Sequence, residues 1–164
     1  MSSIDITQAR ELRNLSISGC NLLRIDASYN RNLRSLDLSH NRLTSFSFAG
    51  VYGDYEKNLL TDIDLSHNYI TSLTFVNTTH IRRMNLADNR LTEMLLKNFD
   101  NLTDIDLSNN RLSGDFSLTY QEQAVNIDLS GNFISSLTTV DMPDLQNFNI
   151  SDNNLTLQTL PLMP

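Results

Sequence analysis

The sequence predicts a mainly β solenoid, in which about seven short coils stack their parallel strands side by side with little or no helix. The first observation is composition, because the 164 residues include 27 Leu and 20 Asn. The second is recurrence: one order of apolar residues and Asn returns seven times, at separations of 21, 27, 21, 21, 22 and 21 residues. The third is the size of this period, since about 21 residues hold a strand and two turns but leave no room for a full helix as well. Residues 1–164 are therefore expected to form a single array.

The strand of each coil is predicted by a motif of the form Leu-x-x-Leu-x-Leu-x-x-Asn-x-Leu. Residues 33–43 match it at every defined position, and the other copies replace Leu by Ile, Met, Phe or Ala. The alternation at Leu-x-Leu predicts a short strand with one buried face. A single coil cannot bury that face alone, so the coils are expected to stack.

The turn after each strand carries the Asn of the motif. A buried side-chain amide at this point can hydrogen-bond backbone N–H and C=O groups of its own coil and of the adjacent coil. The first copy has Cys instead, which fits in size but is only a weak hydrogen-bonding group. The residues at this position are Cys20, Asn41, Asn68, Asn89, Asn110, Asn132 and Asn153.

A second alternating segment follows each turn and predicts the back of the coil. Leu43, Phe46 and Phe48 show the pattern in one coil, and later coils repeat it. We expect an extended or bridge-like segment there. The further examples are Ile70, Leu73, Phe75, Leu91, Met94 and Leu96.

Two coils depart from the regular period. The 27-residue coil carries about six extra residues within 49–57, including Tyr52 and Tyr55. Insertions in repeat proteins usually loop out on one face, which is often the binding face. The 22-residue coil has one extra residue near Gly114. The 49–57 insertion is therefore a candidate contact site.

Taken together, the seven copies resemble the leucine-rich repeat family over nearly the whole chain. The resemblance implies a solenoid with its strands on a concave face, and a structural asparagine ladder at the Asn position. The 21-residue period and the Asp-Leu-Ser-x-Asn core are similar to surface leucine-rich repeat proteins of gut bacteria. That similarity implies an extracellular or cell-surface bacterial protein that recognises a protein or peptide, although a cytoplasmic location stays open.

The residues between the buried positions of each strand are expected to point outward on the concave face. Because parallel strands lie about 4.8 Å apart, equivalent residues form polar columns along the array. The acidic columns can bond turn backbone or contact a partner, and both interpretations stay open. Exposed aromatic residues just after the Asn position are candidates at the rim, since Tyr and Phe are enriched at interfaces. The predicted binding residues are Asp37, Asp62, Asp64, Arg83, Asp104, Asp106, Asp128, Tyr69 and Phe133.

His40, His67 and Asp88 occupy one position of successive coils. Two imidazoles and a carboxylate in a column suit a metal ion. Equivalent positions stack automatically in a solenoid, however, so solvated turn residues are the simpler interpretation. We predict no metal and no cofactor.

Several function classes are disfavoured by the sequence. It has no local nucleophile motif and no phosphate-binding Gly loop, and its paired aspartates lie on an open sheet, so no enzyme is predicted. No apolar run approaches about 18 residues, which excludes a membrane-spanning segment. The net charge of −7 argues against nucleic acid as a partner. The single Cys excludes an internal disulfide.

The charge is uneven along the chain. Residues 1–45 contain six Arg and four acidic residues, whereas residues 112–164 contain six acidic residues and no Lys or Arg. Such a solenoid could steer a polar partner or stack end to end, and solubility is the simpler interpretation.

The leading function is a non-catalytic protein–protein interaction scaffold that uses the concave face and the 49–57 insertion. A surface component that captures carbohydrate or peptide is an alternative, and it predicts aromatic platforms beside paired carboxylates. A structural spacer is a second alternative. The final segment, 155–164, is mostly apolar without a polar cap, so we expect either a fragment of a larger protein or a covered last coil.

Overall fold

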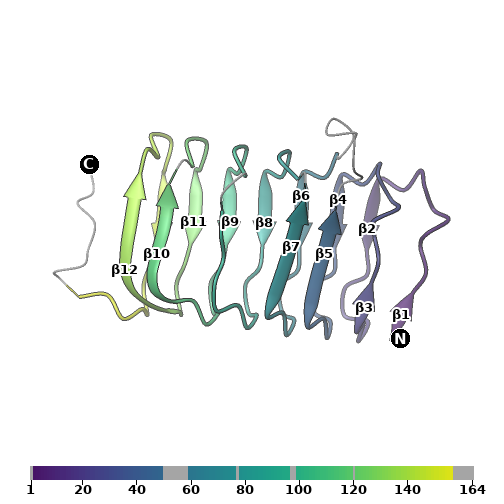
Figure 1. Ribbon diagram of the computed structural model, residues 1–164, viewed down its shortest axis with the longest axis horizontal. Coiled ribbons are helices and arrows are strands. Elements are labelled where there is room, and N and C mark those ends of the chain that lie inside the picture. The colour runs from purple at the N-terminus through teal and green to yellow at the C-terminus, as the bar shows by residue number, and fades with distance from the viewer. Residues whose placement is uncertain (1, 50–58, 77, 97–98, 120, 157–164) are drawn as a thin grey trace.

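A computed structural model describes residues 2–49, 59–76, 78–96, 99–119 and 121–156. These residues form a parallel β-solenoid without helix, which confirms the predicted fold class. Figure 1 shows the coils side by side along one axis, with β1 near one end and β12 near the other. None of the described segments has the helical length and apolar character that crossing a bilayer requires.

The front of the solenoid is one seven-stranded parallel sheet, in the order β13-β11-β9-β8-β6-β4-β2. Each strand is only three residues long because the chain turns immediately after the Leu-x-Leu core. The middle residue points inward, and in β4 to β11 it is buried, while its two neighbours face outward. The strands are β2 (Asn14–Ser16), β4 (Ser35–Asp37), β6 (Asp62–Asp64), β8 (Arg83–Asn85), β9 (Asp104–Asp106), β11 (Asn126–Asp128) and β13 (Asn147–Asn149).

The back of the solenoid holds three separate two-stranded parallel sheets. The first pairs β1 (Ser3–Ile4) with β3 (Arg24–Ile25), and the second pairs β5 (Ser45–Ala49) with β7 (Ser72–Val76). The third pairs β10 (Ser113–Thr119) with β12 (Phe133–Val140). Its register shifts between Gly114 and Asp115, where the pairing passes over Ser135 of β12.

The core between the two faces is a continuous aliphatic stack. Leu38, Leu65, Leu86, Leu107 and Leu129 occupy one column, and each has no exposed surface. Burial of this kind contributes about 1.5–3 kcal/mol per side chain, so the stack supplies much of the stability that a single coil lacks.

The Asn side chains of the turns are bonded as a series that links neighbouring coils. Asn89 Nδ2 donates to the carbonyl oxygens of Leu86 and Ala87 in its own coil and to that of Leu65 in the preceding coil. Asn89 Oδ1 accepts the N–H of Ile70 at 2.9 Å. Equivalent bonds are made by Asn41, Asn68, Asn110, Asn132 and Asn153.

Cys20 begins this series with different bonds. Its thiol lies 3.3 Å from the Ser18 carbonyl oxygen, and its N–H donates to Asn41 Oδ1 at 3.1 Å. The first coil therefore receives the side-chain hydrogen bonds of Asn41 and supplies no amide of its own at this position.

The residue before each of these Asn side chains adopts a left-handed backbone conformation. His40, His67, Asp88 and Asn109 have φ of 53–54°, and Gly131 has φ of 65°. At Gly131 an added Cβ would collide with Asn109 Oδ1, whereas at Gly19, with φ of 67°, it would meet no atom within 4 Å.

These two glycines give a matched pair of substitutions. We expect Gly19→Ala to lower the free energy of unfolding by about 1 kcal/mol, because a left-handed conformation strains any residue that has a Cβ. Gly131→Ala should cost about 1 kcal/mol more, because the Asn109 side chain must also move. Urea unfolding of both variants measures the difference, and equal losses would show that Asn109 moves without cost.

Candidate functional site

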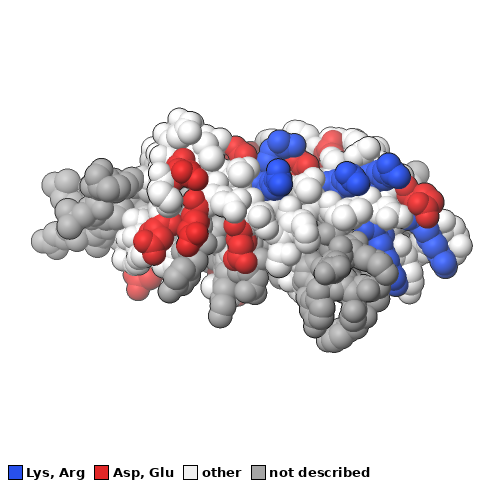
Figure 2. Space-filling view, turned by 90° about the horizontal axis from the view of Figure 1, so that it is seen from above, with Lys and Arg blue, Asp and Glu red and all other residues white. Residues whose placement is uncertain are grey.

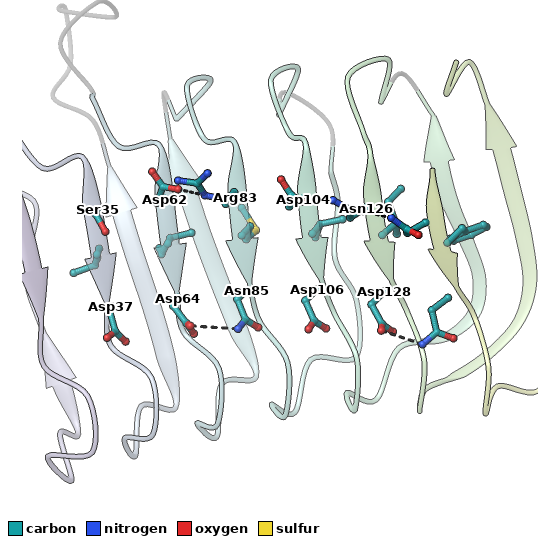
Figure 3. A pocket seen from close by; sticks show the side chains of 18 of the residues that line it. Ser35, Asp37, Asp62, Asp64, Arg83, Asn85, Asp104, Asp106, Asn126 and Asp128 are labelled. Carbon is teal, nitrogen blue, oxygen red and sulfur yellow. Dashed lines mark hydrogen bonds and ion pairs between the residues drawn. The ribbon is translucent and has the colours of Figure 1, made fainter. Parts of the chain in front are cut away.

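The outer face of the front sheet is hollowed into a groove of about 840 Å³, which we call the front groove. It crosses six coils, from β4 to β13, and along its floor lie the middle residues of the strands, such as Met84 and Ile105, whose side chains are buried in the core. Two rows of polar residues flank this floor, as Figure 3 shows. The first-position row is Ser35, Asp62, Arg83, Asp104, Asn126 and Asn147, and the third-position row is Asp37, Asp64, Asn85, Asp106, Asp128 and Asn149.

Carboxylates of the third-position row bond the turn that follows each strand. Asp64 Oδ1 accepts both the N–H and the hydroxyl of Ser66, at 2.9 and 2.7 Å. Asp37 and Asp128 make the same pair of bonds with the Ser two residues on, and Asp106 accepts the N–H of Ser108. One oxygen of each carboxylate therefore holds the turn.

The second oxygens of this row bond sideways between coils. Asp37 Oδ2 accepts the Ser16 hydroxyl at 2.7 Å, and Asp128 Oδ2 accepts Asn149 Nδ2 at 3.0 Å. Asn85 Nδ2 donates to Asp64 Oδ2 at 3.3 Å. These bonds join three pairs of neighbouring coils, so Asp37, Asp64 and Asp128 each share a hydrogen bond with the next coil on one side.

The first-position row is also joined by contacts between neighbouring coils, one of them from Asn147 Nδ2 to Asn126 Oδ1 at 2.6 Å. Arg83 forms an ion pair with Asp62 on the adjacent strand, and Asn126 Nδ2 donates to Asp104. Thr61 and Thr103 donate their hydroxyls to the carboxylates that follow them, at 2.6 and 2.7 Å. These contacts lie at the border of the groove.

The pKa values of two third-position carboxylates are lowered from their ordinary value of 3.8. Partial burial, the largest single influence, raises the pKa of Asp37. The Ser39 and Ser16 hydroxyls, the Ser39 N–H and nearby His40 together outweigh it. For Asp128, burial is likewise outweighed by Ser130 and Asn149. Both groups are therefore held as carboxylates at neutral pH.

This lowering predicts acid sensitivity. A group whose folded pKa is depressed stabilises the fold above its unfolded pKa, and the contribution is lost as the pH falls through the folded pKa. We expect the unfolding free energy to fall between about pH 5 and about pH 2, and to fall less in Asp37→Asn/Asp128→Asn. Asn fits, because Asn149 already bonds Ser151 in the same way. Urea unfolding across this pH range measures the unfolding free energy of both proteins. The same dependence on pH in the variant and in the unmodified chain would contradict the lowered pKa values of Asp37 and Asp128.

The other binding and metal-ligand candidates from the sequence lie at the edge of the solenoid where the front strands end, which we call the strand-end edge. Tyr69 and Phe133 are 43% and 53% exposed, and neither lines the front groove. His40 and His67 stack with ring centroids 4.1 Å apart, and His67 Nδ1 lies 3.4 Å from Asp88 Oδ2. Among the described residues, no three His, Cys, Asp or Glu side chains are grouped as metal ligands. Tyr52 and Tyr55 of the 49–57 insertion lie outside the described residues.

Charge is separated along the solenoid axis. Figure 2 looks onto the edge of the solenoid where the front strands begin, which we call the strand-start edge. It shows Lys and Arg mostly over the N-terminal half and Asp and Glu gathered over the C-terminal coils. The separation follows directly from the uneven sequence, because a solenoid keeps chain order as spatial order.

Sequence reasoning missed two groups of polar residues. Arg42, Arg90 and Arg111 all follow directly after a ladder Asn, and they share the edge with Tyr69. Asn30 is fully buried at the opposite edge, where its Nδ2 donates to the carbonyl oxygens of Ile6 and Ala9. The arginines could have been found by reading the position after the Asn in every copy. Asn30 has no equivalent Asn in the other coils.

Comparison with known proteins gives the same fold. The family model described as Leucine Rich Repeat matches residues 32–51 and 101–120. No curated protein matches the sequence.

Solved structures similar to this chain include the functional domain of InlJ from Listeria monocytogenes. It is 21% identical, with a TM-score of 0.74 over 98% of this chain and 38% of that one. YopM from Yersinia enterocolitica is 23% identical, with a TM-score of 0.68 over 94% of this chain and 36% of that one. The leucine-rich repeat domain of APL1B is 24% identical, with a TM-score of 0.79 over 94% and 46% of the two chains.

The chain spans less than half the length of each of these three structures, and at such identities the likeness concerns the fold. The fold has the coils and the parallel front sheet that the 21-residue spacing predicts. Two of the copies match the family model directly. The chain therefore has the fold of leucine-rich repeat proteins, and two of its copies carry the repeat of that family.

Proposed function

We propose that this chain is a non-catalytic protein–protein interaction module that binds a segment of its partner in the front groove. The leucine-rich repeat fold commonly mediates protein–protein interaction, and the observation that supports the groove is its open, continuous form across six coils. The 49–57 insertion is part of the proposal as a second contact. In the sequence it lies between β5 and β6.

The lining of the front groove supports a basic partner segment. The middle residues of the strands lie along the groove with their side chains buried, whereas the borders carry six Asp and one Arg. Charged borders contribute orientation and association rate. A partner segment with Lys or Arg would match them.

The state of the carboxylates supports a non-catalytic role. General acid catalysis by a carboxyl group needs a pKa raised towards neutral pH. Asp37 and Asp128 have lowered pKa values, and hydrogen bonds in the turns occupy their oxygens. These two carboxylates therefore present fixed negative charge and hydrogen-bond acceptors.

The proposal is tested by binding to a peptide array that contains basic, acidic and neutral sequences. The variant Asp62→Asn/Asp104→Asn removes two charges from the groove border and keeps the shape of both side chains. We expect it to lose at least about tenfold in affinity for the peptides that the unmodified chain selects, which corresponds to about 1.4 kcal/mol. The control is Asp115→Asn/Asp152→Asn, which makes the same change of charge at exposed positions outside the groove.

The alternatives predict other outcomes. A spacer would bind no peptide, or would bind equally well after both pairs of substitutions. A carbohydrate-capturing component would select glycans on a parallel array and lose them in Tyr69→Ala. Either result would overturn the proposal.

We further infer an extracellular or cell-surface location. The inference is supported by the 21-residue period and the Asp-Leu-Ser-x-Asn core, which are similar to surface leucine-rich repeat proteins of gut bacteria. Protease treatment of intact source cells should degrade the chain, and protection from protease would contradict this location.

A further inference from the structure

A column of basic and aromatic residues runs along the strand-end edge of the solenoid. It consists of the residue directly after the ladder Asn in five successive coils, and backbone hydrogen bonds fix its spacing. The Tyr69 N–H donates to the Leu43 carbonyl oxygen and the Arg90 N–H to the Ile70 carbonyl oxygen, both at 2.9 Å. We call this column the strand-end stripe: Arg42, Tyr69, Arg90, Arg111 and Phe133.

All five side chains of the strand-end stripe are exposed. The Arg90 guanidinium lies over the Tyr69 ring, with Cζ 4.5 Å from the ring centroid. A cation above an aromatic ring is attracted to its face, so this contact orders both side chains at the surface. Side chains ordered in this way lose less entropy when a partner binds.

The arginines of the strand-end stripe have no acidic partner within the described part of the chain. None of Arg42, Arg90 and Arg111 forms an ion pair with any residue that the structure describes. In the front groove, by contrast, Arg83 is paired with Asp62. Arg90 and Arg111 lie on successive coils, where like charges repel each other. An anionic partner would remove this repulsion and supply the missing pairs.

We propose that the strand-end stripe is a second binding surface, which takes an extended acidic segment of a partner protein. The guanidinium groups would hold carboxylates as bidentate pairs, and the Tyr69 and Phe133 rings would contact apolar side chains of the same segment. Arg and Tyr are also the residue types that dominate binding energy at protein interfaces.

The size and charge of the chain favour an acidic protein segment over a polyanion. Arg42 and Arg111 are three coils apart, or roughly 14 Å, which an extended segment of four or five residues spans. A long nucleic acid or sulfated glycan would extend beyond this distance, and the chain as a whole carries −7. Repulsion is screened only beyond about 8 Å at physiological salt, so a short acidic segment is accommodated better than a long polyanion.

The proposal is tested by fluorescence anisotropy with a labelled peptide of Glu-Glu-Leu repeats. The variant Arg90→Glu/Arg111→Glu reverses two charges of the stripe at exposed positions. We expect it to weaken peptide binding at least about tenfold, and Tyr69→Ala to weaken it about threefold. Binding by the unmodified chain should also weaken as salt is added.

Two matched controls locate the effect. Arg31→Glu/Arg34→Glu makes the same change of charge at exposed residues of the strand-start edge, and it should change binding by less than about twofold. The groove variant Asp62→Asn/Asp104→Asn should leave this binding intact. The outcome for the strand-end stripe is therefore separate from the outcome for the front groove.

Three results would overturn the proposal. One is no binding of the Glu-Glu-Leu peptide by the unmodified chain, and another is an equal loss in both arginine variants. The third is tighter binding of a heparin oligosaccharide or single-stranded DNA than of the peptide, with the loss in Arg90→Glu/Arg111→Glu shared by these probes. A thermal midpoint unchanged from that of the unmodified chain shows that each variant is folded.

Discussion

Replacing Asn89 by Ala should lower the free energy of unfolding by about 3–5 kcal/mol. The substitution removes three hydrogen bonds from Nδ2 and one to Oδ1. It leaves the Ile70 N–H and the carbonyl oxygens of Leu65, Leu86 and Ala87 without these bonds, in a turn that side chains shield from water. Each buried backbone group that loses its partner costs about 1–3 kcal/mol, with partial compensation if water enters.

The same change at an exposed Asn provides the control. Asn147 Nδ2 donates only to Asn126 Oδ1, at an exposed position of β13. Asn147→Ala should therefore change stability by no more than about 0.5 kcal/mol. Urea unfolding followed by circular dichroism measures both variants. Equal losses of stability in Asn89→Ala and Asn147→Ala would mean that the hydrogen bonds of the buried Asn side chains do not stabilise the turns.

Replacing Leu86 by Ala should lower the free energy of unfolding by about 2–5 kcal/mol, through lost burial and the cavity that remains. Leu86 has no exposed surface, and it stacks between the equivalent leucines Leu65 and Leu107. A solenoid restricts relaxation, because the backbone hydrogen bonds of two neighbouring coils hold the walls of the cavity.

Leu95→Ala is the matched control, since the Leu95 side chain is 83% exposed. It deletes the same atoms outside the core and should change stability by no more than about 0.5 kcal/mol. Thermal unfolding compares the two, and a midpoint for Leu86→Ala equal to that of the unmodified chain would contradict the stacked core.

The regular parts of the fold could be predicted because local pattern and global packing agree. Leu36 and Leu38 alternate as a strand, Asn41 marks the turn, and the same order in every copy requires stacking. The back was harder to predict. Phe46 and Phe48 indicate an extended segment correctly, but the lengths of β10 and β12 depend on pairing between coils, which no single copy specifies.

The sequence predicts which residues of the candidate site face outward, but it predicts only some of the contacts between them. The outward columns that contain Asp64 and Asp104 follow from strand periodicity. Which oxygen bonds a turn and which bonds a neighbouring coil depends on side-chain conformation, and the sequence does not specify it. The burial of Asn30 likewise depends on two carbonyl oxygens of another coil.

The column geometry has a consequence for how such a chain can change over generations. Strand contacts on the front face join only adjacent coils, and every coil repeats the same buried positions. Duplication or loss of one complete unit, such as residues 69–89, would therefore leave the aliphatic interior intact while altering the length of everything displayed outside it. The number of repeats can therefore change the length of these surfaces without any change to the residues of the core.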